Sequence, residues 1–317
     1  MKYYIYVLAL GLLLALAASP ALASGAAVNL SVPSSFPVSS VARATDSDGN
    51  PLSPGPGSVD FTHVNGALYV KVAAPSVSGS RLVSLDDDES GITFRNNTLV
   101  LPIYSGGARA GTLVATTDNL TAVDGGFFGA ITGLELDPAE LTAATDGMGF
   151  TAGAALLLGD LPASADYDLA FADNETVNEA IRQDLEASGL APAGMTPVFG
   201  VSGSPAGAGA ISDMIVTVAA VGDWGRRYGG GNATFYRFAD GGLSRAPYRR
   251  LDAGNGSVAY QAVVPGAGQL VVVAPEPRDQ PPAPGQAAGL DDIALLGGVL
   301  AALLIGLAYM VRRVTRR

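Results

Sequence analysis

The feature that most constrains this chain is an uncharged run close to its C-terminus. Residues 293–311 contain one tyrosine and otherwise only apolar or small side chains, with Asp291 and Asp292 before them and Arg312 and Arg313 after them. As a helix, this run would extend over roughly 28 Å, which matches the hydrocarbon thickness of a bilayer. A buried helix of a globular protein usually carries a polar stripe, and this run has none. We therefore predict a single C-terminal transmembrane helix over residues 293–311.

The sequences at the two ends of the chain predict how the protein is oriented in the membrane. Residues 312–317 hold four arginines, and positive charge is enriched on the cytoplasmic side of membrane helices. At the other end, Lys2 precedes a hydrophobic run that finishes in Ala-Leu-Ala at residues 21–23. This pattern predicts a cleaved secretory signal over residues 1–23, with an uncleaved anchor as the alternative. Both ends indicate a type I membrane protein whose bulk lies outside the cell.

Asparagine stands unusually often at positions where N-glycosylation takes place. Six of the ten asparagines lie two residues before Ser or Thr with no intervening proline. At this Ser and Thr content, chance would give about one or two such sites. The excess favours an exported, glycosylated surface, with coincidence in a chain rich in Ser and Thr as the alternative. The candidate acceptors are Asn29, Asn96, Asn119, Asn174, Asn232 and Asn255.

The charge of the extracellular part is strongly acidic and unevenly distributed. All 29 acidic residues lie there, which excludes nucleic-acid binding and suits the attraction of cations or basic partners. Residues 44–224 carry 23 acidic and five basic residues, whereas residues 225–250 carry six arginines and only Asp240. The contrast predicts two modules with different surfaces. The arginines could pair with acidic glycans, a neighbouring subunit or the acidic part of the same chain.

The composition favours many short strands over helices. The chain has 41 Gly, 20 Pro and no Cys, so an exported form has no disulfides and depends on its hydrophobic core. From residue 59 onward, β-branched runs alternate with turn residues, as at residues 66–74 and 97–105. One helix is expected over residues 177–188, where Thr176 and Glu179 form a capping box and apolar residues recur at four-residue spacing. The predicted fold class is mainly β, with sandwich-like modules, one short α-helix and the membrane helix.

These patterns divide the chain into consecutive segments. In order, they are a signal peptide (1–23), a Pro/Ser/Gly-rich N-terminal segment (24–58), an acidic β-rich domain containing the helix (59–203), a C-terminal β-module (204–274), a Pro-rich stalk (275–292), the transmembrane helix (293–311) and a cytoplasmic basic tail (312–317). Within the N-terminal segment, residues 46–58 are expected to be turn and linker.

Carboxylates are the main candidates for chemistry in this chain. Asp86, Asp87, Asp88 and Glu89 are weak candidates for a Ca²⁺ site, because carboxylate oxygens are its preferred ligands. Alternate side chains of a strand point to opposite faces, so four adjacent carboxylates cannot all reach one ion, and a solvated loop tip is the alternative. The stretch DSDGN at residues 46–50 also alternates carboxylates, but its glycine is misplaced for an EF-hand loop.

Other signals for catalysis are weak. His63 is the only histidine, so a multi-histidine metal site is not available, and we expect it at a strand end or turn. The stretch GMGFTA at residues 147–152 matches a loose dinucleotide-binding pattern without the strand and helix that such a site needs, which favours a glycine-rich turn. We assign no catalytic residue, metal or cofactor. The chain is expected not to be an enzyme, with a carboxylate-based hydrolase as the remaining enzymatic alternative.

The predicted membrane helix has small residues at four-residue spacing on one face. Such a stripe lets two helices approach closely, which makes a homodimer through the membrane a hypothesis. The residues are Ala294, Gly298, Ala302 and Gly306.

The C-terminal strands resemble a known family. Trp224, the sequence Arg-Phe-Ala-Asp-Gly at residues 237–241 and the sequence Ala-Val-Val-Pro-Gly at residues 262–266 are similar to the PGF-pre-PGF module of surface proteins from methanogenic archaea. The resemblance covers residues 213–274 and, more weakly, residues 112–203. It departs from the family where Ala267 replaces a phenylalanine, and the Pro-Gly-Phe sorting motif expected before the membrane helix is absent.

The resemblance implies a protein of an archaeal cell envelope and supplies no catalytic residues. We expect a membrane-anchored surface protein with a structural, adhesive or envelope-interaction role, whose partners are the membrane and envelope or S-layer proteins. The alternative is an extracellular module that binds a solute, a cation or a glycan for a membrane complex.

Overall fold

The computed structural model describes residues 27–52, 57–74, 81–145, 148–220, 223–228, 233–254 and 257–277. The predicted signal peptide, membrane helix and basic tail, together with nearly all of the predicted stalk, lie outside these residues. Within the described ranges, no helix is long and apolar enough to cross a membrane.

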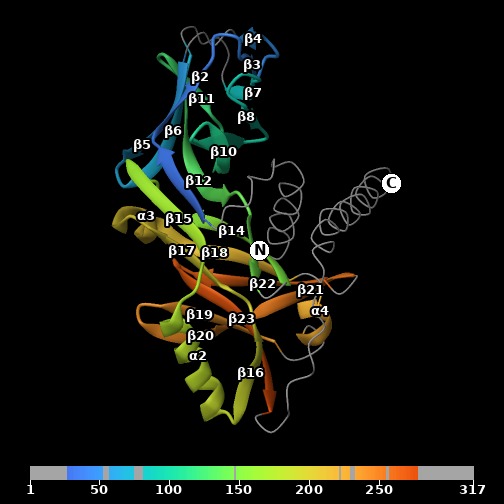
Figure 1. The fold of residues 1–317 in the computed structure, drawn as a ribbon. Helices are drawn as coiled ribbons and strands as arrows, with labels where there is room; N and C mark the ends of the chain where they lie inside the picture. Colours follow the sequence, from blue (N-terminus) through green and yellow to red (C-terminus); the bar gives the residue numbers. More distant parts are fainter. Residues whose placement is uncertain are drawn as a thin grey trace, which may run out of the picture.

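The described part of the chain is mainly β, as predicted, and its strands form a larger and a smaller sheet (Figure 1). The larger sheet contains β2 (Ser35–Val38), β3 (Arg43–Asp46), β4 (Pro51–Leu52), β5 (Gly57–Val64), β6 (Ala67–Ala73), β7 (Leu82–Asp87), β8 (Ile92–Arg95), β9 (Thr98–Ser105), β10 (Ala108–Thr117), β11 (Thr121–Val123), β12 (Gly126–Pro138), β13 (Leu141–Thr145), β14 (Met148–Leu158), β18 (Ile211–Ala220), β21 (Tyr248–Gly254) and β22 (Ser257–Pro265). The smaller sheet contains β1 (Ala27–Pro33), β15 (Ser164–Ala172), β16 (Leu190–Met195), β17 (Val198–Gly203), β19 (Thr234–Ala239), β20 (Gly242–Ala246) and β23 (Gly268–Pro277).

The order of neighbouring strands shows how the larger sheet is built around β12. Its main path runs β21-β22-β18-β14-β12-β10-β9-β8-β7-β3-β4. The long strand β12 pairs with β6 through its first half and with β10 through its second half. Gly126 begins this strand with φ +156°, and a Cβ there would lie 2.2 Å from the carbonyl oxygen of Val72. Only glycine fits this close approach, so the junction between β6 and β12 depends on it.

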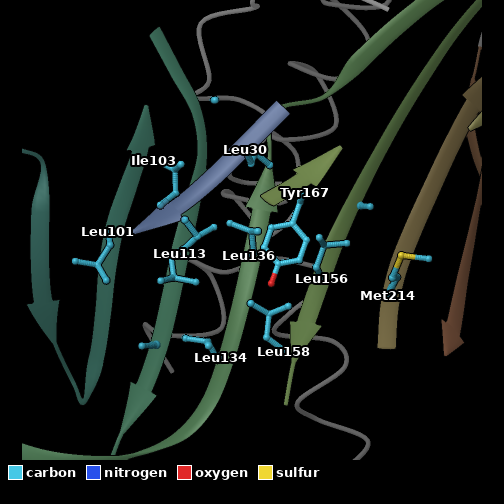
Figure 2. Packing of buried hydrophobic residues seen from close by; sticks show 14 of the residues in the cluster. Leu30, Leu101, Ile103, Leu113, Leu134, Leu136, Leu156, Leu158, Tyr167 and Met214 are labelled. Atoms are coloured by element: carbon cyan, nitrogen blue, oxygen red, sulfur yellow. The ribbon is translucent and has the colours of Figure 1, made fainter. Parts of the chain in front are cut away.

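A continuous hydrophobic core lies between the two sheets. In Figure 2, Leu30 and Tyr167 from the smaller sheet lie over Leu113, Leu136 and Leu156 from the larger one. All five side chains are almost completely removed from solvent. Burial alternates along β1 and β10, as expected for strands with one face on the core. This core supplies the stability that a chain without cysteine cannot take from disulfides.

The predicted helix is present as α2 (Glu175–Ala187), on the face of the smaller sheet that points away from the core. Val177, Ile181 and Leu185 form its buried face, as the spacing predicted. The N-cap is Asn174 and not Thr176, because the Asn174 carboxamide oxygen accepts a hydrogen bond of 3.3 Å from the backbone N–H of Val177. The sequence prediction was therefore right about the helix and two residues late for its start.

Two short helices occupy segments where the sequence analysis expected none. Helix α3 (Pro205–Ala210) begins at Ser204, whose hydroxyl accepts a hydrogen bond from Gly207 N. Helix α4 (Asp223–Tyr228) contains Trp224. The preceding strand β18 stops at Ala220. The fully buried indole meets Tyr228 edge-on, with ring centroids 5.5 Å apart.

The strands on both sides of residue 203, the predicted domain boundary, share the same sheets. Strand β18 pairs with β14, and β23 pairs with β17 and with β16. The boundary was predicted from local sequence, and local sequence does not determine which strands pair. The N-terminal segment at residues 24–58 contains β1 to β4, and β4 lies within residues 46–58, the stretch expected to be turn and linker. Pro33, Pro37 and Pro51 lie at exposed strand positions, where a missing N–H is tolerated.

The arginine-rich segment at residues 225–250 pairs with the acidic part of the same chain. Arg245 on β20 forms a 2.6 Å ion pair with Asp184 of helix α2. Tyr236 donates a 2.7 Å hydrogen bond to the same carboxylate, and the Arg245 guanidinium lies over its ring. The sequence suggested three kinds of partner for these arginines, and the structure shows a contact with the acidic part of the same chain.

Candidate binding groove

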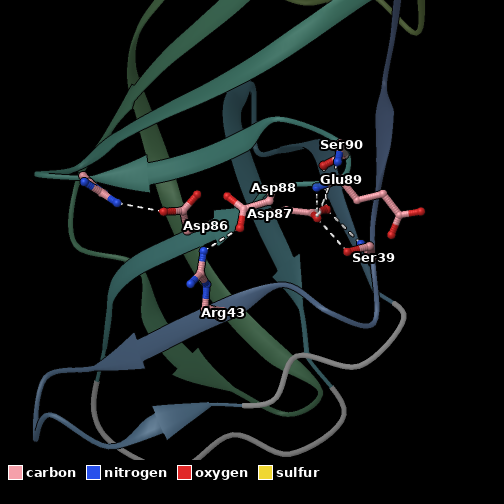
Figure 3. A network of polar contacts seen from close by, with 8 residues as sticks. Ser39, Arg43, Asp86, Asp87, Asp88, Glu89 and Ser90 are labelled. Atoms are coloured by element: carbon pink, nitrogen blue, oxygen red, sulfur yellow. Dashed lines mark hydrogen bonds and ion pairs between the residues drawn. The ribbon is translucent and has the colours of Figure 1, made fainter.

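The acidic run at residues 86–89 lies at the end of β7 and in the turn that leads to β8 (Figure 3). Asp86 forms a 2.8 Å ion pair with Arg95, and Asp88 forms a 2.5 Å ion pair with Arg43. The Arg43–Asp88 pair is exposed on both sides, whereas in the Arg95–Asp86 pair the aspartate is partly buried. The two arginines come from different strands, so the neighbouring carboxylates are drawn in different directions.

Asp87 has a structural role inside this run. Its side chain is fully buried and accepts hydrogen bonds from the backbone N–H and hydroxyl of Ser39, at 2.9 and 2.6 Å, and from the Ser90 hydroxyl at 2.5 Å. Burial raises the pKa of the Asp87 carboxyl, but the hydrogen bonds from the two serines outweigh this effect and lower the pKa to about 2. The ionised carboxylate ties the segment after β2 to the β7–β8 turn.

The four carboxylates of this run therefore do not converge on one point. Asp86 and Asp87 are successive residues of β7, so their side chains point to opposite faces. Across the described ranges, no group of three or more His, Asp or Glu side chains is placed to hold a metal ion. The stretch at residues 46–50 is likewise a closed turn. Asp46 accepts hydrogen bonds from the backbone N–H groups of Asp48 and Asn50, both at 2.9 Å. Burial opposes ionisation of Asp46, but these bonds hold the pKa of its carboxyl below the ordinary value.

Glu89 differs from its three neighbours, because its side chain extends away from them (Figure 3). It lies at the rim of a surface groove of about 400 Å³. One wall comes from β1 and β2, and the other comes from the β7–β8 turn and β9. The lining residues are Ser31, Pro33, Ser35, Phe36, Pro37, Glu89, Ser90, Ile92, Pro102, Ile103 and Tyr104.

The groove combines an apolar floor with a small number of polar groups. Phe36, Ile92, Pro102 and Ile103 are buried, and they form the floor on which a ligand would lie. Tyr104 is 55% exposed, an unusual degree of exposure for a large aromatic side chain. Apolar walls with a few hydrogen-bonding groups are the usual composition of a ligand site.

The sequence analysis identified Glu89 but missed the other residues of this groove. The signal was present as a two-residue alternation over residues 31–38, where Val32, Phe36 and Val38 are buried and the serines and prolines between them are exposed. Proline is depleted in strands, so this stretch was not predicted to be one. A strand at a sheet edge tolerates proline, so the alternation was the better guide.

His63 lies in β5, at an exposed position as expected. Its Nε2 is 2.5 Å from a carboxylate oxygen of Asp160, which follows β14. The same oxygen accepts a hydrogen bond of 2.7 Å from Leu161 N. The histidine thus connects two segments far apart in the sequence and does not line the groove. The stretch at residues 148–152 is the start of strand β14 and not a turn, while Gly147 lies outside the described residues.

A second set of carboxyls lies on the outer face of the larger sheet. Glu135 and Asp137 are alternate residues of β12, so they share a face, and both are half-buried. Burial raises the pKa of Glu135, and the negative charge of Asp137 raises it further. Glu140, partly exposed, lies over Gly153, and the surrounding protein raises the pKa of its carboxyl to about 7. None of the three lines the groove.

The candidate glycosylation sites that are described occupy different environments. Asn29 and Asn119 are exposed, although each contacts a charged side chain. Asn96 is exposed in the two-residue turn between β8 and β9, with φ +52°. Asn174 is the half-buried cap of α2, and its carboxamide nitrogen donates a 2.7 Å hydrogen bond to Gln269. The remaining candidates lie outside the described residues, as do the helix-packing candidates: Asn232, Asn255, Ala294, Gly298, Ala302 and Gly306.

The fold and groove define a mainly β protein of two facing sheets with an open, mostly apolar surface site. Comparison of the chain with protein-family models, curated proteins and solved structures finds no match.

Proposed function

We propose that the chain is a membrane-anchored, N-glycosylated surface protein of an archaeal envelope, with a structural, adhesive or envelope-interaction role. The β-rich body would stand outside the cell on the Pro-rich stalk, and the basic tail would lie in the cytoplasm. The similarity of residues 213–274 to the PGF-pre-PGF module supports the same assignment. Partners of this kind of protein are the membrane, envelope or S-layer proteins and, through the small-residue face of the membrane helix, a second copy.

The observation that carries the proposal is the exposure of three candidate glycosylation sites. Asn29, Asn96 and Asn119 all present their side chains at the surface of the β body. Asn96 stands at the end of a hairpin, in a turn that an oligosaccharide could occupy without displacing core residues. An excess of acceptor sequences at accessible positions is what selection for glycosylation would produce.

The test uses the full-length chain, tagged at its C-terminus and produced in an archaeal host. The expected result is a protein that stays in membranes after alkaline extraction, loses its bulk to protease added to intact cells, and carries glycans on Asn96 by mass spectrometry. Asn96→Asp should remove that glycan, whereas Asn97→Asp preserves the acceptor sequence and should not. Aspartate tolerates the positive φ of both turn positions. A tagged chain that is recovered in the cytosol without glycan would overturn the proposal.

Self-association through the membrane helix has its own test. A double change of Gly298→Leu and Gly306→Leu should weaken association in membranes, because leucine separates the two helices. Unchanged association would remove the homodimer from the proposal and leave the surface location standing.

A second candidate function is that of an extracellular binding module. It is favoured by the groove between β1–β2 and β9, since a purely structural surface has no need of an open apolar site with a carboxylate at its rim.

A further inference from the structure

One wall of the groove is a row of exposed residues from two successive strands, which are joined by a bend at Ser34. Ser31, Pro33, Ser35 and Pro37 lie along β1 and β2 at two-residue spacing, and all four line the groove and are exposed. At a rise of about 3.3 Å per residue, each strand contributes roughly 7 Å of this wall, and the bend at Ser34 keeps the whole row shorter than a straight strand. A wall of this kind can line a few residues of an extended chain.

The wall also limits how a ligand can be recognised. Pro33 and Pro37 have no N–H, so this edge cannot form a regular ladder with an added strand. Recognition therefore depends on side chains. The Ser31 hydroxyl can donate and accept hydrogen bonds, and the Ser35 hydroxyl, which donates to Asp60, can accept one. Tyr104 offers an exposed ring on the opposite wall.

Glu89 contributes a charge that the protein itself does not neutralise. Asp86 and Asp88 are each paired with an arginine, and Asp87 is satisfied by hydrogen bonds. In the part of the chain that the structure describes, the Glu89 carboxylate has neither an ion pair nor a hydrogen-bond donor, and it is exposed at the groove rim. Residues 31–104, from the first to the last residue that lines the groove, contain seven acidic and four basic residues. A ligand of positive charge is complementary to this region.

We propose that the groove binds an extended peptide segment of a basic partner protein, whose Lys or Arg side chain pairs with Glu89. The apolar part of the segment lies on Phe36, Pro102 and Ile103, and the cationic side chain passes beside Tyr104, where a ring face also attracts cations. This proposal deepens the second candidate function by naming the class of partner, and it rests on that function.

The probes are capped, fluorescein-labelled octapeptides of alternating Val and Ser, with one Arg placed in turn at each Ser position. Each has a twin in which citrulline replaces Arg, which keeps the shape and removes the charge. Binding to the full-length chain in detergent is followed by fluorescence anisotropy. At least one Arg peptide is expected to bind about three- to fivefold more tightly than its twin, and the difference should shrink as salt rises, since the pair is exposed.

Two groove variants and a matched control locate the site. Glu89→Gln should weaken binding of the Arg peptide about three- to fivefold and leave binding of its citrulline twin unchanged. Tyr104→Ala should weaken binding of both peptides. Asp124→Asn removes a carboxylate from another exposed turn, between β11 and β12, and should leave binding unchanged. A folded Glu89→Gln protein is expected, because Glu89 makes no side-chain contact that holds its turn.

The proposal is overturned if no Arg peptide binds below a millimolar concentration, if Arg and citrulline twins bind alike, or if Asp124→Asn reduces binding as much as Glu89→Gln. Binding of neutral oligosaccharides in preference to all the peptides would overturn it also. These results are independent of the fractionation and glycan measurements, so a failure of the groove proposal is distinguishable from a failure of the surface location.

Discussion

Replacement of Asp87 by asparagine is the sharpest test of how the acidic run is built. Asn has nearly the same shape, but it has no charge and puts an amide N–H₂ where the fold needs acceptors. Asn keeps one carbonyl oxygen, so the donors to the other carboxylate oxygen lose their acceptor. These are either the Ser39 N–H and the Ser90 hydroxyl, or the Ser39 hydroxyl and the Glu89 N–H. Asp88→Asn is the matched control, because its ion pair with Arg43 is exposed on both sides.

The expected loss follows from the pKa of the Asp87 carboxyl. In the fold this pKa is about 2, against an ordinary value of 3.8. Since the folded value is the lower one, the ionised carboxylate adds stability that is complete above pH 3.8 and is lost as the pH falls through 2. At about 1.4 kcal/mol per pKa unit, and after allowance for solvent near the turn, this contribution is about 1–2 kcal/mol. Unsatisfied serine donors add about 1 kcal/mol, for a total of about 2–3 kcal/mol at pH 7.

The assay is denaturant unfolding of the full-length chain at pH 7 and pH 2, followed by the fluorescence of Trp224, the only tryptophan and a fully buried one. The difference in free energy of unfolding between wild type and Asp87→Asn should decrease to about 1 kcal/mol at pH 2, because the wild-type carboxylate is partly protonated there. Asp88→Asn should stay within about 0.5 kcal/mol of wild type at pH 7. A gap below 0.5 kcal/mol at pH 7, or one that does not change with pH, would refute the reasoning.

Three further substitutions test other parts of the structure. Asn174→Ala should destabilise the protein by about 1–2 kcal/mol, whereas Thr176→Ala should cost less than about 0.5 kcal/mol, because the first residue caps α2; equal losses in chemical denaturation would contradict this. Glu135→Gln should raise the melting temperature at pH 9 and leave it unchanged at pH 4. The folded-state pKa of Glu135 lies above the ordinary 4.5, so the protonated carboxyl is compatible with the fold at low pH and its ionisation destabilises the fold as the pH rises. A variant with the wild-type melting temperature at pH 9 would contradict the interaction between Glu135 and Asp137. Within α3, Gly207→Ala should lower the melting temperature, because its Cβ would lie 2.8 Å from a backbone oxygen of β15, whereas Gly209→Ala meets nothing within 4 Å and should be neutral or slightly stabilising.

The fold class and the helix could be predicted from the sequence because each depends on a local pattern. The spacing of Val177, Ile181 and Leu185 specifies which face of α2 is buried, wherever the helix packs. Strand pairing is different, since it joins residues far apart in the chain. Nothing local in β18 indicates that its neighbours are β14 and β22, and the charge contrast at residue 225 suggested a division that the sheets do not make.

The candidate site could be predicted only in part, for a related reason. Strand alternation correctly indicated that the carboxylates at residues 86–89 point apart, but their partners Arg43, Arg95 and Ser39 come from other strands. Which carboxylate is left without a partner therefore depends on the tertiary structure. Tyr104 gave no signal at all, because an aromatic residue in a strand is usually buried.

The groove wall gains its rigidity from the segment that joins the two sheets. Strand β1 pairs with β15 in the smaller sheet, and after Ser34 the chain continues as β2, which pairs with β5 in the larger one. The inward side chains of this segment, including Leu30 and Phe36, belong to the common core, so the outward serines and prolines are fixed by packing on their other side. A ligand that meets a prearranged row of groups loses less of its binding free energy to ordering the protein. The same connection means that a bound peptide would contact residues from both sheets, and its binding free energy would add to the stability of their association.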